Sequence, residues 1–517
     1  MRPDYMAGSS PGENLDAIRH DAYNSGDRKI TEKLHSEGSQ TARERIISLL
    51  DSDTFVEIDA LINHRSYDYN LHLHKPFGDG VVAGHGMLNG RRIVCFSQDK
   101  SVFSGSIGEM HGKKIVKILE FAEKSLLPII AIWDGVGQRV EEGVSSLGPS
   151  GDVLNIIAAC SGRVPIISVV LGNVVGASAL AIGLSDFTIF EASYGRLLLS
   201  ESSPDNPAHH SQETGSTNFH KNGGGIACLF AEDEHIALDM VSEIISFFPD
   251  NMDSVPEIKK NGDIWNRKCE SISEIVPNDP EKTYDVREII FEITDNESFL
   301  ELFPNHASNI VIGLGRLDGH SVGIVANQAS VMNGFLDIDA AVKAARFIRT
   351  CDCFNIPLLT FVDVPGFLPE VTQEWSGLIR QGAKLFFAYS EATVPKLSVV
   401  IGKAYGEAYL AMCSKHLGSD YNIAWPSSKI IVSSGKDIIN IANKKEMPTH
   451  EKNIFTQGDI LKDYSEKFED PFVLAKNGLL DDVIEPLQTR EYLIRALRPL
   501  LSKKEWTPPK KHDNIPL

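Results

Sequence analysis

Apolar and polar positions follow one pattern that occurs twice along the chain. Each occurrence begins with a short apolar run that ends in aspartate, LPIIAIWD (Leu127–Asp134) and IPLLTFVD (Ile356–Asp363). A helical stretch follows, and a proline then opens a second apolar run, in VPIISVVLGNVVGASA (Val164–Ala179) and VPKLSVVIGKAYGEAY (Val394–Tyr409). Short apolar runs bounded by Pro and Gly are typical of buried strands, so we expect strands that alternate with helices.

The two occurrences keep their order and their spacing. The Val-Pro pairs begin at Val164 and Val394, and the interval between the aspartate-ended runs differs from that interval by a single position. An earlier landmark, IVCFSQD (Ile93–Asp99), matches GIVANQA (Gly323–Ala329), which sets Gln98 opposite Gln328. A period this long predicts duplicated domains rather than solenoid repeats, and the alternation predicts an α/β fold in each. With a polar connection near residues 255–279, we expect domains at 1–275 and 276–517.

One apolar run is long enough to cross a membrane. Residues 164–184 carry no charge over 21 positions. The matching run, however, contains Lys396, Lys403 and Glu407, and charges are costly inside a bilayer. We therefore interpret both runs as buried elements of a protein that does not enter the membrane.

The charge and the cysteine content exclude several classes of function. Fifty basic against seventy acidic side chains leave a net charge of −20, which disfavours nonspecific binding to nucleic acid or anionic membranes. An anionic substrate would therefore need a local positive site. The seven cysteines form no paired CxxC motif, which argues against a zinc ribbon and fits a cytoplasmic enzyme. We expect no metal site, and we interpret the loop with His209, His210 and His220 as solvated.

The duplicated glycine turns are the first candidates for chemistry. Gly172 and Gly176 match Gly402 and Gly406, and each set leads from a strand into a helix. The first N–H groups of a helix lack internal partners, so such a turn can hold an oxygen that gains negative charge. Small residues also serve tight packing between a helix and a strand. Two matched copies in one chain favour the functional interpretation.

Longer segments resemble a known family. They include KPFGDGVVAGHGMLNGRRIVCFSQDKSVFSGSIGEMHGKKI, ARFIRTCDCFNIPLLTFVDVPGFLP, LIRQGAKLFFAYSEATVPKLSVVIGKAY and the terminal KKHDNIPL. Together they resemble the carboxyltransferase (β) subunits of biotin-dependent acyl-CoA carboxylases, of the propionyl-CoA carboxylase β type, over nearly the whole chain.

The resemblance implies a fold, a reaction and an assembly. It implies two tandem crotonase-like domains of ββα units, the first holding a coenzyme A thioester and the second receiving biotin. The reaction moves a carboxyl group from carboxybiotin to the α-carbon of an acyl-CoA. Negative charge then develops on one oxygen of each reactant, which gives the duplication a chemical reason. The resemblance also implies a homohexamer with active sites between subunits.

The resemblance places functional roles on particular residues. The backbone donors of the first turn fall on Gly176 and Ala177, and those of the second on Glu407 and Ala408. The cofactor-binding candidates are Gly135, Gly137, Arg139 and Gly143 in the thioester-side loop and Gly406 and Tyr409 on the biotin side. For Arg139, contact with phosphates or a carboxylate and a structural ion pair with Glu141, Glu142 or another acid both stand. Lys113 and Lys114 are candidates for the coenzyme A phosphates or for a solvated helix face.

Several positions depart from the family pattern. GVGQR replaces SGGAR in the thioester-side loop, and SSGKD (Ser433–Asp437) replaces another family run. Glu407 stands where glycine is usual, with three interpretations: a side chain turned away and paired with Lys or Arg, a protonated acid in a dry pocket, or a general acid/base. Leu410 stands where propionyl-type enzymes carry Asp, which indicates a different acyl group or a plain core residue.

Absent segments indicate a partner. No Ala/Val-Met-Lys-Met sequence and no ATP-binding carboxylase segment occur, so the resemblance implies biotin on a separate biotin carboxylase and carrier protein. Three alternatives stay open: a biotin-dependent decarboxylase or transcarboxylase, a crotonase-type lyase or hydratase that uses Glu407, and a weakened scaffold subunit of a carboxylase complex.

Overall fold

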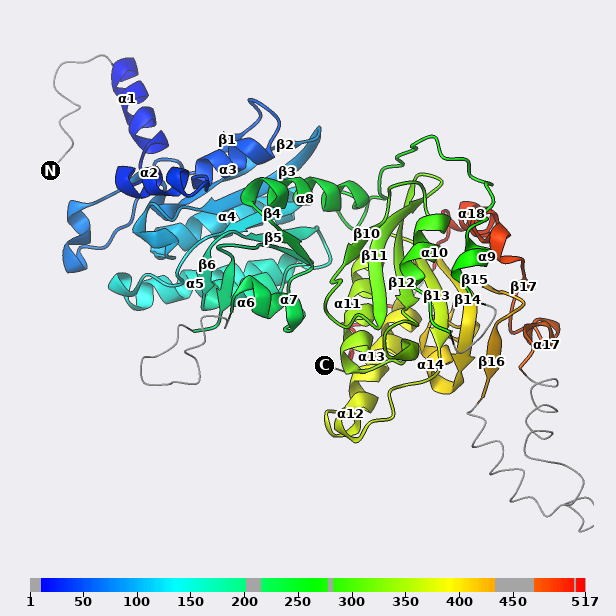
Figure 1. The fold of residues 1–517 in the computed structure, drawn as a ribbon. Helices are drawn as coiled ribbons and strands as arrows, with labels where there is room; N and C mark the ends of the chain where they lie inside the picture. Colours follow the sequence, from blue (N-terminus) through cyan, green and yellow to red (C-terminus); the bar gives the residue numbers. More distant parts are fainter. Residues whose placement is uncertain (1–10, 201–214, 278–281, 433–468, 506–507, 517) are drawn as a thin grey trace, which may run out of the picture. The chain divides into compact units, whose positions relative to one another are not determined.

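Two α/β units make up the protein. The structure, a computed structural model, describes residues 11–200, 215–277, 282–432, 469–505 and 508–516. The chain divides into compact units at Met1–Ser254 and Val255–Leu517. Each unit contains a sheet with helices on its faces, and the expected α/β class is confirmed (Figure 1).

The first unit is built on a seven-stranded sheet in the order β1-β2-β3-β4-β5-β7-β9. Its strands are β1 (Val56–Glu57), β2 (Val81–Leu88), β3 (Arg91–Gln98), β4 (Ile129–Trp133), β5 (Ile166–Val170), β7 (Phe187–Glu191) and β9 (Leu229–Ala231). The pairs from β1 to β3 are antiparallel and those from β3 to β9 are parallel. A separate parallel pair joins β6 (Asn173–Val175) to β8 (Arg196–Leu198).

The second unit repeats this arrangement with the order β10-β11-β12-β13-β14-β15-β17. Its strands are β10 (Leu300–Leu302), β11 (Ile310–Leu317), β12 (His320–Asn327), β13 (Leu358–Val364), β14 (Lys396–Tyr405), β15 (Tyr421–Ala424) and β17 (Asp482–Val483). The short strand β16 (Lys429–Ile431) pairs with the end of β14. The central strands are almost completely buried, as expected for parallel strands between helical layers.

Helices pack on the two sheets in matching places. In the first unit these are α3 (Ala42–Leu49), α4 (Glu109–Ser125), α5 (Val144–Cys160), α6 (Ala177–Gly183) and α8 (Glu234–Phe247). In the second they are α10 (Val286–Ile293), α11 (Ile338–Cys353), α13 (Leu378–Glu391), α14 (Gly406–Ala411) and α18 (Thr489–Leu500).

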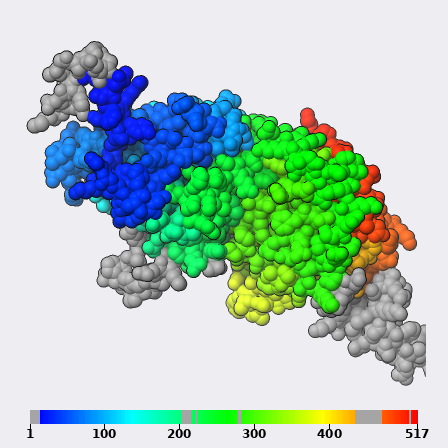
Figure 2. All heavy atoms as spheres, turned by 45° about the horizontal axis from the view of Figure 1, so that its top comes forward, coloured from blue at the N-terminus to red at the C-terminus, as the bar shows by residue number. Residues whose placement is uncertain are grey.

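Shorter or peripheral helices complete the described chain. They are α1 (Pro11–Tyr23), α2 (Arg28–Ser36), α7 (Thr217–Asn222), α9 (Ile272–Ile275), α12 (Val371–Trp375) and α17 (Pro471–Lys476). Figure 2 shows α1 and α2, in dark blue, on the outside of the first unit.

The strand registers support the duplication and correct one match. Val94 pairs with Ile129 in the first sheet, and Gly323 pairs with Leu358 at the same relative place in the second. The strand before the turn drifts by one position, since β5 begins to pair at Ile166 and β14 at Lys396. This register sets Gln98 opposite Asn327, not Gln328. Gln98 and Asn327 also make equivalent hydrogen bonds. The side-chain carbonyl of each accepts a hydrogen bond from the backbone N–H of the aspartate at the end of the next strand.

Residues 255–275, which the sequence placed in the first domain, belong to the second unit. The Cys269 N–H donates to the Leu487 carbonyl at 2.9 Å, and Cys269 and Ile272 are fully buried in the second core. Polar composition indicated a connection here, but these buried contacts are made with residues far along the chain.

The uncharged run at 164–184 folds as β5, β6 and α6 rather than as one helix. In the described parts of the chain, no helix is long and apolar enough to cross a bilayer.

Candidate active site

Both glycine turns have a glycine with positive φ where a strand meets a helix. β6 ends at Val175, Gly176 takes φ +73°, and α6 begins at Ala177. β14 ends at Tyr405, and α14 then begins at Gly406 with φ +54°. Glycine adopts a positive φ without the steric cost that other residues incur, which is why a glycine stands in both turns. The sequence therefore encodes one turn twice.

The backbone donors of the first turn differ from the expected pair. The Gly176 N–H donates to the Leu198 carbonyl at 3.1 Å, because it continues the ladder between β6 and β8. Of the expected pair, only the Ala177 N–H, at the start of α6, lies in the helical turn whose N–H groups lack intrahelical acceptors. The strand ladder, which sequence spacing does not reveal, takes up the other donor.

The second turn places Glu407 and Ala408 in the first turn of α14, where N–H groups also lack intrahelical acceptors. The Glu407 side chain is exposed and makes no hydrogen bond or ion pair with any described residue. Neither a paired lysine or arginine nor a dry pocket surrounds it within the described chain. Tyr409 is buried, which raises the pKa of its hydroxyl to about 12, and Leu410 is half-buried.

The loop that follows β4 lies against the first turn. Gly137 has φ +90°, and a Cβ there would stand 3.1 Å from the Val175 carbonyl oxygen. A Cβ on Gly176 would stand 3.0 Å from the Gln138 side-chain oxygen. The structure thus brings together two segments that the resemblance assigned to the thioester side.

The ends of this loop are also occupied by glycines for steric reasons. A Cβ on Gly135 would lie 2.2 Å from the Gly105 carbonyl oxygen, closer than real Cβ contacts. Gly143 has φ +54° and begins α5. Both positions shape the loop.

Arg139 holds the loop from inside. Its guanidinium is 1 % exposed and lies between Asp79 at 2.6 Å and Glu142 at 2.8 Å. The remaining N–H groups donate to the Asp79 carbonyl and to Ser106, and Phe103 lies under the guanidinium. All five N–H donors are used within the protein. The structure therefore shows the ion-pair alternative and leaves no donor for a phosphate.

The two lysines in HGKK are occupied as well. The Lys114 ammonium is buried and donates to the Val81 carbonyl at 2.8 Å and to Glu57 at 3.1 Å. Burial lowers its pKa. Lys113 pairs with Glu109 one turn earlier on α4.

Two carboxylates that sequence analysis treated only as landmarks support the turns. A Cβ on Gly172 would lie 1.8 Å from an Asp134 oxygen, and one on Gly402 would lie 2.5 Å from an Asp363 oxygen. Each aspartate ends the strand beside the one that leads into a turn. The sequence signal that could have identified these aspartates as part of the site is their position at the carboxyl ends of neighbouring parallel strands.

The partners of these carboxylates differ. Asp134 accepts a bond from Arg45 at 3.0 Å, and Arg45 also binds Glu234 at 2.6 Å. Asp363 accepts bonds from the Tyr284 hydroxyl at 2.8 Å and the Lys403 backbone N–H at 2.7 Å. Burial raises the pKa of Asp363, and its two hydrogen bonds act in the opposite direction.

Metal-ligating clusters are missing from the part of the chain that the structure describes, where no group of three or more His, Cys, Asp or Glu side chains is arranged to hold a metal ion. His220 binds the Leu197 carbonyl at 3.0 Å. His209, His210 and the segment Ser433–Asp437 lie outside the described residues.

Comparisons with known proteins cover almost the whole chain. The carboxyl transferase domain family matches residues 33–515. The biotin-dependent acetyl-/propionyl-coenzyme A carboxylase beta5 subunit of Mycobacterium leprae is 42 % identical over 503 residues, 94 % of this chain and 91 % of that protein. The methylmalonyl-CoA decarboxylase subunit alpha of Propionigenium modestum is 40 % identical over 497 residues, 95 % of this chain and 96 % of that protein.

A solved structure agrees equally well. Transcarboxylase 12S, described as a hexamer with methylmalonyl-coenzyme A and methylmalonic acid bound, superposes with a TM-score of 0.94 at 37 % identity. The match covers 99 % of both chains.

Proposed function

The chain belongs to the carboxyl transferase family, and from that premise we propose that it transfers a carboxyl group from carboxybiotin on a separate carrier to the α-carbon of an acyl-CoA. The observation that carries the proposal is the pair of matched glycine turns in a chain that matches the family from residue 33 to 515. Each turn supplies backbone N–H groups to one oxygen. The fold is the two-domain crotonase-like arrangement of transcarboxylase 12S.

On the thioester side, the Ala177 N–H holds the carbonyl oxygen of the acyl-CoA as negative charge develops on it. A fixed donor of this kind typically contributes about 10²–10³ in rate. Gly135, Gly137 and Gly143 shape the wall of this site, and Arg139 positions the loop without touching the substrate. Gly176 contributes the space left by its missing side chain rather than an N–H donor.

On the other side, the first turn of α14 fits an oxygen acceptor such as the ureido group of biotin. A Cβ on Gly406 would lie 3.2 Å from the Val432 carbonyl oxygen, so the glycine leaves this space open. The N–H groups of Glu407 and Ala408 follow directly in the chain. Biotin would supply the transferable carboxyl group on its ureido nitrogen. Tyr409 supports the turn from the core, and Leu410 is the candidate for contact with the acyl chain.

Partners follow from the same proposal. Relatives are named as subunits of biotin-dependent carboxylases, and transcarboxylase 12S is described as a hexamer. We propose that this chain forms a homohexamer and works with a biotin carboxylase and a biotin carrier. Its seven cysteines form no disulfide bond, which supports a reducing cytoplasmic setting.

The reaction run backward tests this proposal. The purified chain is incubated with free biotin and malonyl-, methylmalonyl-, ethylmalonyl- and longer α-carboxyacyl-CoAs, and loss of the carboxyl group is followed. Biotin-dependent decarboxylation of one member is expected and identifies the acyl group next to Leu410. Decarboxylation without biotin, or none by a folded assembly, would overturn the proposal.

A second candidate is a biotin-dependent decarboxylase, which the 40 % identity to methylmalonyl-CoA decarboxylase subunit alpha favours. The same two turns serve transfer in either direction. Reconstitution with the carrier and biotin carboxylase separates the two, because only net carboxylation requires ATP.

A further inference from the structure

The second unit contains a cavity whose lining lies outside the glycine turn. Its volume is ≈ 450 Å³, which is within the range of small-molecule sites. It opens where β13, β14, β15 and β17 reach their carboxyl ends, a usual place for ligands in parallel sheets. None of the turn residues from Gly406 to Leu410 lines it.

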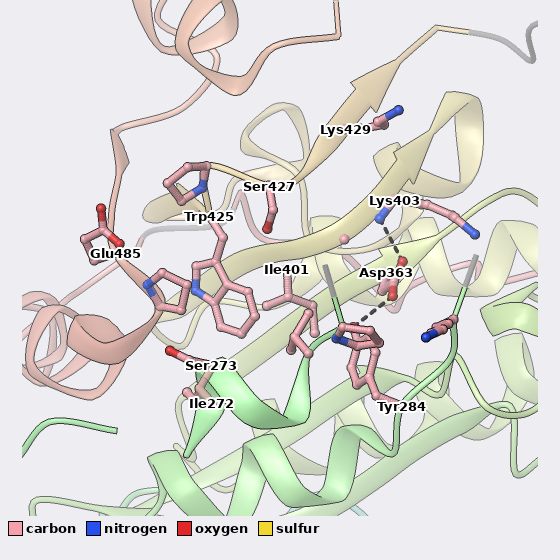
Figure 3. Close-up of a pocket in the computed structure, with 16 residues that line it drawn as sticks. Ile272, Ser273, Tyr284, Asp363, Ile401, Lys403, Trp425, Ser427, Lys429 and Glu485 are labelled. Carbon is pink, nitrogen blue, oxygen red and sulfur yellow. Dashed lines mark hydrogen bonds between the residues drawn. The ribbon is translucent and has the colours of Figure 1, made fainter. Parts of the chain in front are cut away.

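The lining has an apolar floor and a charged rim (Figure 3). The floor residues Trp425, Ile401 and Ile272 are at most 1 % exposed, and the accessible apolar lining comes from Val276, Pro426 and Pro486. Figure 3 shows Lys403 and Lys429 on one side and Glu485 on the opposite side, beyond Trp425. The cavity therefore offers accessible apolar side chains with cations at one end.

The lysines of this rim have few ion-pair partners among the described residues, although the charge of Lys403 acts on the nearby Asp363 carboxyl. Lys403 and Lys282 make no ion pair with a described residue, and Lys429 has only Glu469 at 3.9 Å. The two carboxyls of the lining are placed differently: Asp363 is bonded to Tyr284 and to the Lys403 backbone, and Glu485 lies across the cavity. In a chain of net charge −20, such a group of lysines is a local attraction for an anion.

In the first unit, the carboxylate that matches Asp363 is Asp134, and it is covered by other side chains. α3 matches α10, because Phe55 and Phe299 both pack on matching glycines of the neighbouring strand, Gly84 and Gly313. This match sets Arg45 opposite a buried isoleucine of α10. In the first unit the Arg45 guanidinium lies between Asp134 and Glu234, with all three side chains at most 7 % exposed.

We propose that the cavity of the second unit binds a small organic anion, whose apolar body lies against Val276, Pro426 and Pro486 and whose carboxylate or phosphate is held by Lys403 and Lys429. The ligand contacts β14 directly before the segment that leads to Gly406. It therefore occupies a site separate from the glycine turn but on the same strand. The lysines determine the charge of the ligand.

Calorimetric titration of the full chain tests the proposal. The probes are indole-3-acetate and phenyl phosphate, which separate a carboxylate from a phosphate, and neutral indole-3-acetamide as the matched control. We expect saturable binding of at least one anion and none of the amide. Lys403→Met should weaken the anion about 10- to 100-fold, as loss of one charged hydrogen bond does. Its backbone bond to Asp363 remains.

Two further variants make the result decisive. Lys476→Met removes an exposed lysine of the same unit outside the cavity and should leave binding unchanged. Ser273→Trp fills the rim and should abolish binding. The proposal fails if neither anion binds at millimolar concentration, if the amide binds as well as the acid, or if both lysine variants lose binding equally. Displacement of the anion by free biotin would also overturn it, because the cavity would then belong to the biotin site.

Discussion

The two units keep one geometry but hold it together with different chemistry. At the end of the central strand, Asp134 is neutralised by Arg45 in the first unit, whereas Asp363 is bonded to the neutral hydroxyl of Tyr284 in the second. Both carboxylates still lie against the glycine that precedes a turn. Backbone geometry therefore has to be kept for the turns to form, while the groups that stabilise it were free to diverge.

The loops beside the turns show the same difference. Buried Arg139 holds the first loop, and the register places Leu368, whose N–H donates to the Leu336 carbonyl, at the matching position of the second. At these two places an ion pair stabilises the first unit, whereas a neutral hydroxyl or a backbone hydrogen bond stabilises the second. At these places the first unit should therefore be more sensitive to loss of a charge.

The largest effect is expected from Arg45→Met compared with Tyr284→Phe. Removing Arg45 leaves Asp134 and Glu234 buried without their cation, which should lower the free energy of unfolding by about 3–5 kcal/mol. Tyr284→Phe removes one hydrogen bond to a carboxylate, worth about 1.5–3 kcal/mol. Denaturant unfolding, with hydrogen exchange to locate the loss in one unit, measures both.

Arg45→Lys is the matched control for this comparison. It keeps the charge but cannot donate to both carboxylates as the guanidinium does, so its loss should lie between the two values. Equal losses for Arg45→Met and Tyr284→Phe would show that the units do not differ in the way proposed.

A smaller effect is expected from His111, which only the first unit has, since Ala340 stands at the matching position. Burial, with the nearby Arg139 charge, lowers the pKa of His111 to about 3. The unfolded chain then binds more protons between about pH 6.5 and 3, so the stability from His111 is complete above pH 6.5 and is lost as pH falls. At pH 5 this amounts to about 2 kcal/mol.

The check is the unfolding free energy of the wild type and of His111→Gln at pH 7 and pH 5. Glutamine retains a donor for the Asp79 carbonyl but does not titrate. The wild type should lose about 2 kcal/mol more than the variant between these pH values. Parallel losses in both proteins would mean that His111 does not titrate differently on folding.

The smallest effect is expected from exchanging the residues after the turn glycines. Ala177 and Glu407 occupy matching positions, each directly after the glycine of its turn. A carboxylate about 4 Å from a developing negative charge in water costs about 1 kcal/mol, or about fivefold in rate. Ala177→Glu should therefore slow biotin-dependent decarboxylation severalfold, and Glu407→Gly should leave it unchanged or raise it by a similar factor.

Ala177→Gln and Glu407→Gln separate charge from size in this experiment. Each glutamine variant should behave like the uncharged member of its pair. Complete loss of activity in a folded Glu407→Gln protein would instead support the general acid/base interpretation of Glu407.

Much of the site was readable in the sequence because it is local. A glycine between an apolar run and a small-residue helix specifies a turn of positive φ, and its repetition at the same interval as the Val-Pro pairs predicted both turns at Gly176 and Gly406. The aspartates after the β-branched runs were visible too. Their support of the glycines was not, because it acts between neighbouring strands.

Contacts between distant segments account for what the sequence analysis misassigned. The Gly176 N–H is taken by Leu198, residues 255–275 are buried by the second unit, and Gln98 corresponds to Asn327. Arg139 was left between two roles because its main partner, Asp79, lies 60 residues away along the chain. None of these pairings produces a periodicity or a spacing in a single sequence from which it could be predicted.

The α/β class and the places where a strand turns into a helix follow from the sequence, because each depends on residues next to one another in the chain, and the duplication is visible because those local patterns recur. The folded structure is needed to know which N–H groups are still available, which cations are already paired and where the second unit contains a cavity. Those properties depend on which distant groups meet in the folded protein. A buried charge or hydrogen-bond donor is available to bind a ligand only if no other group of the protein already pairs with it.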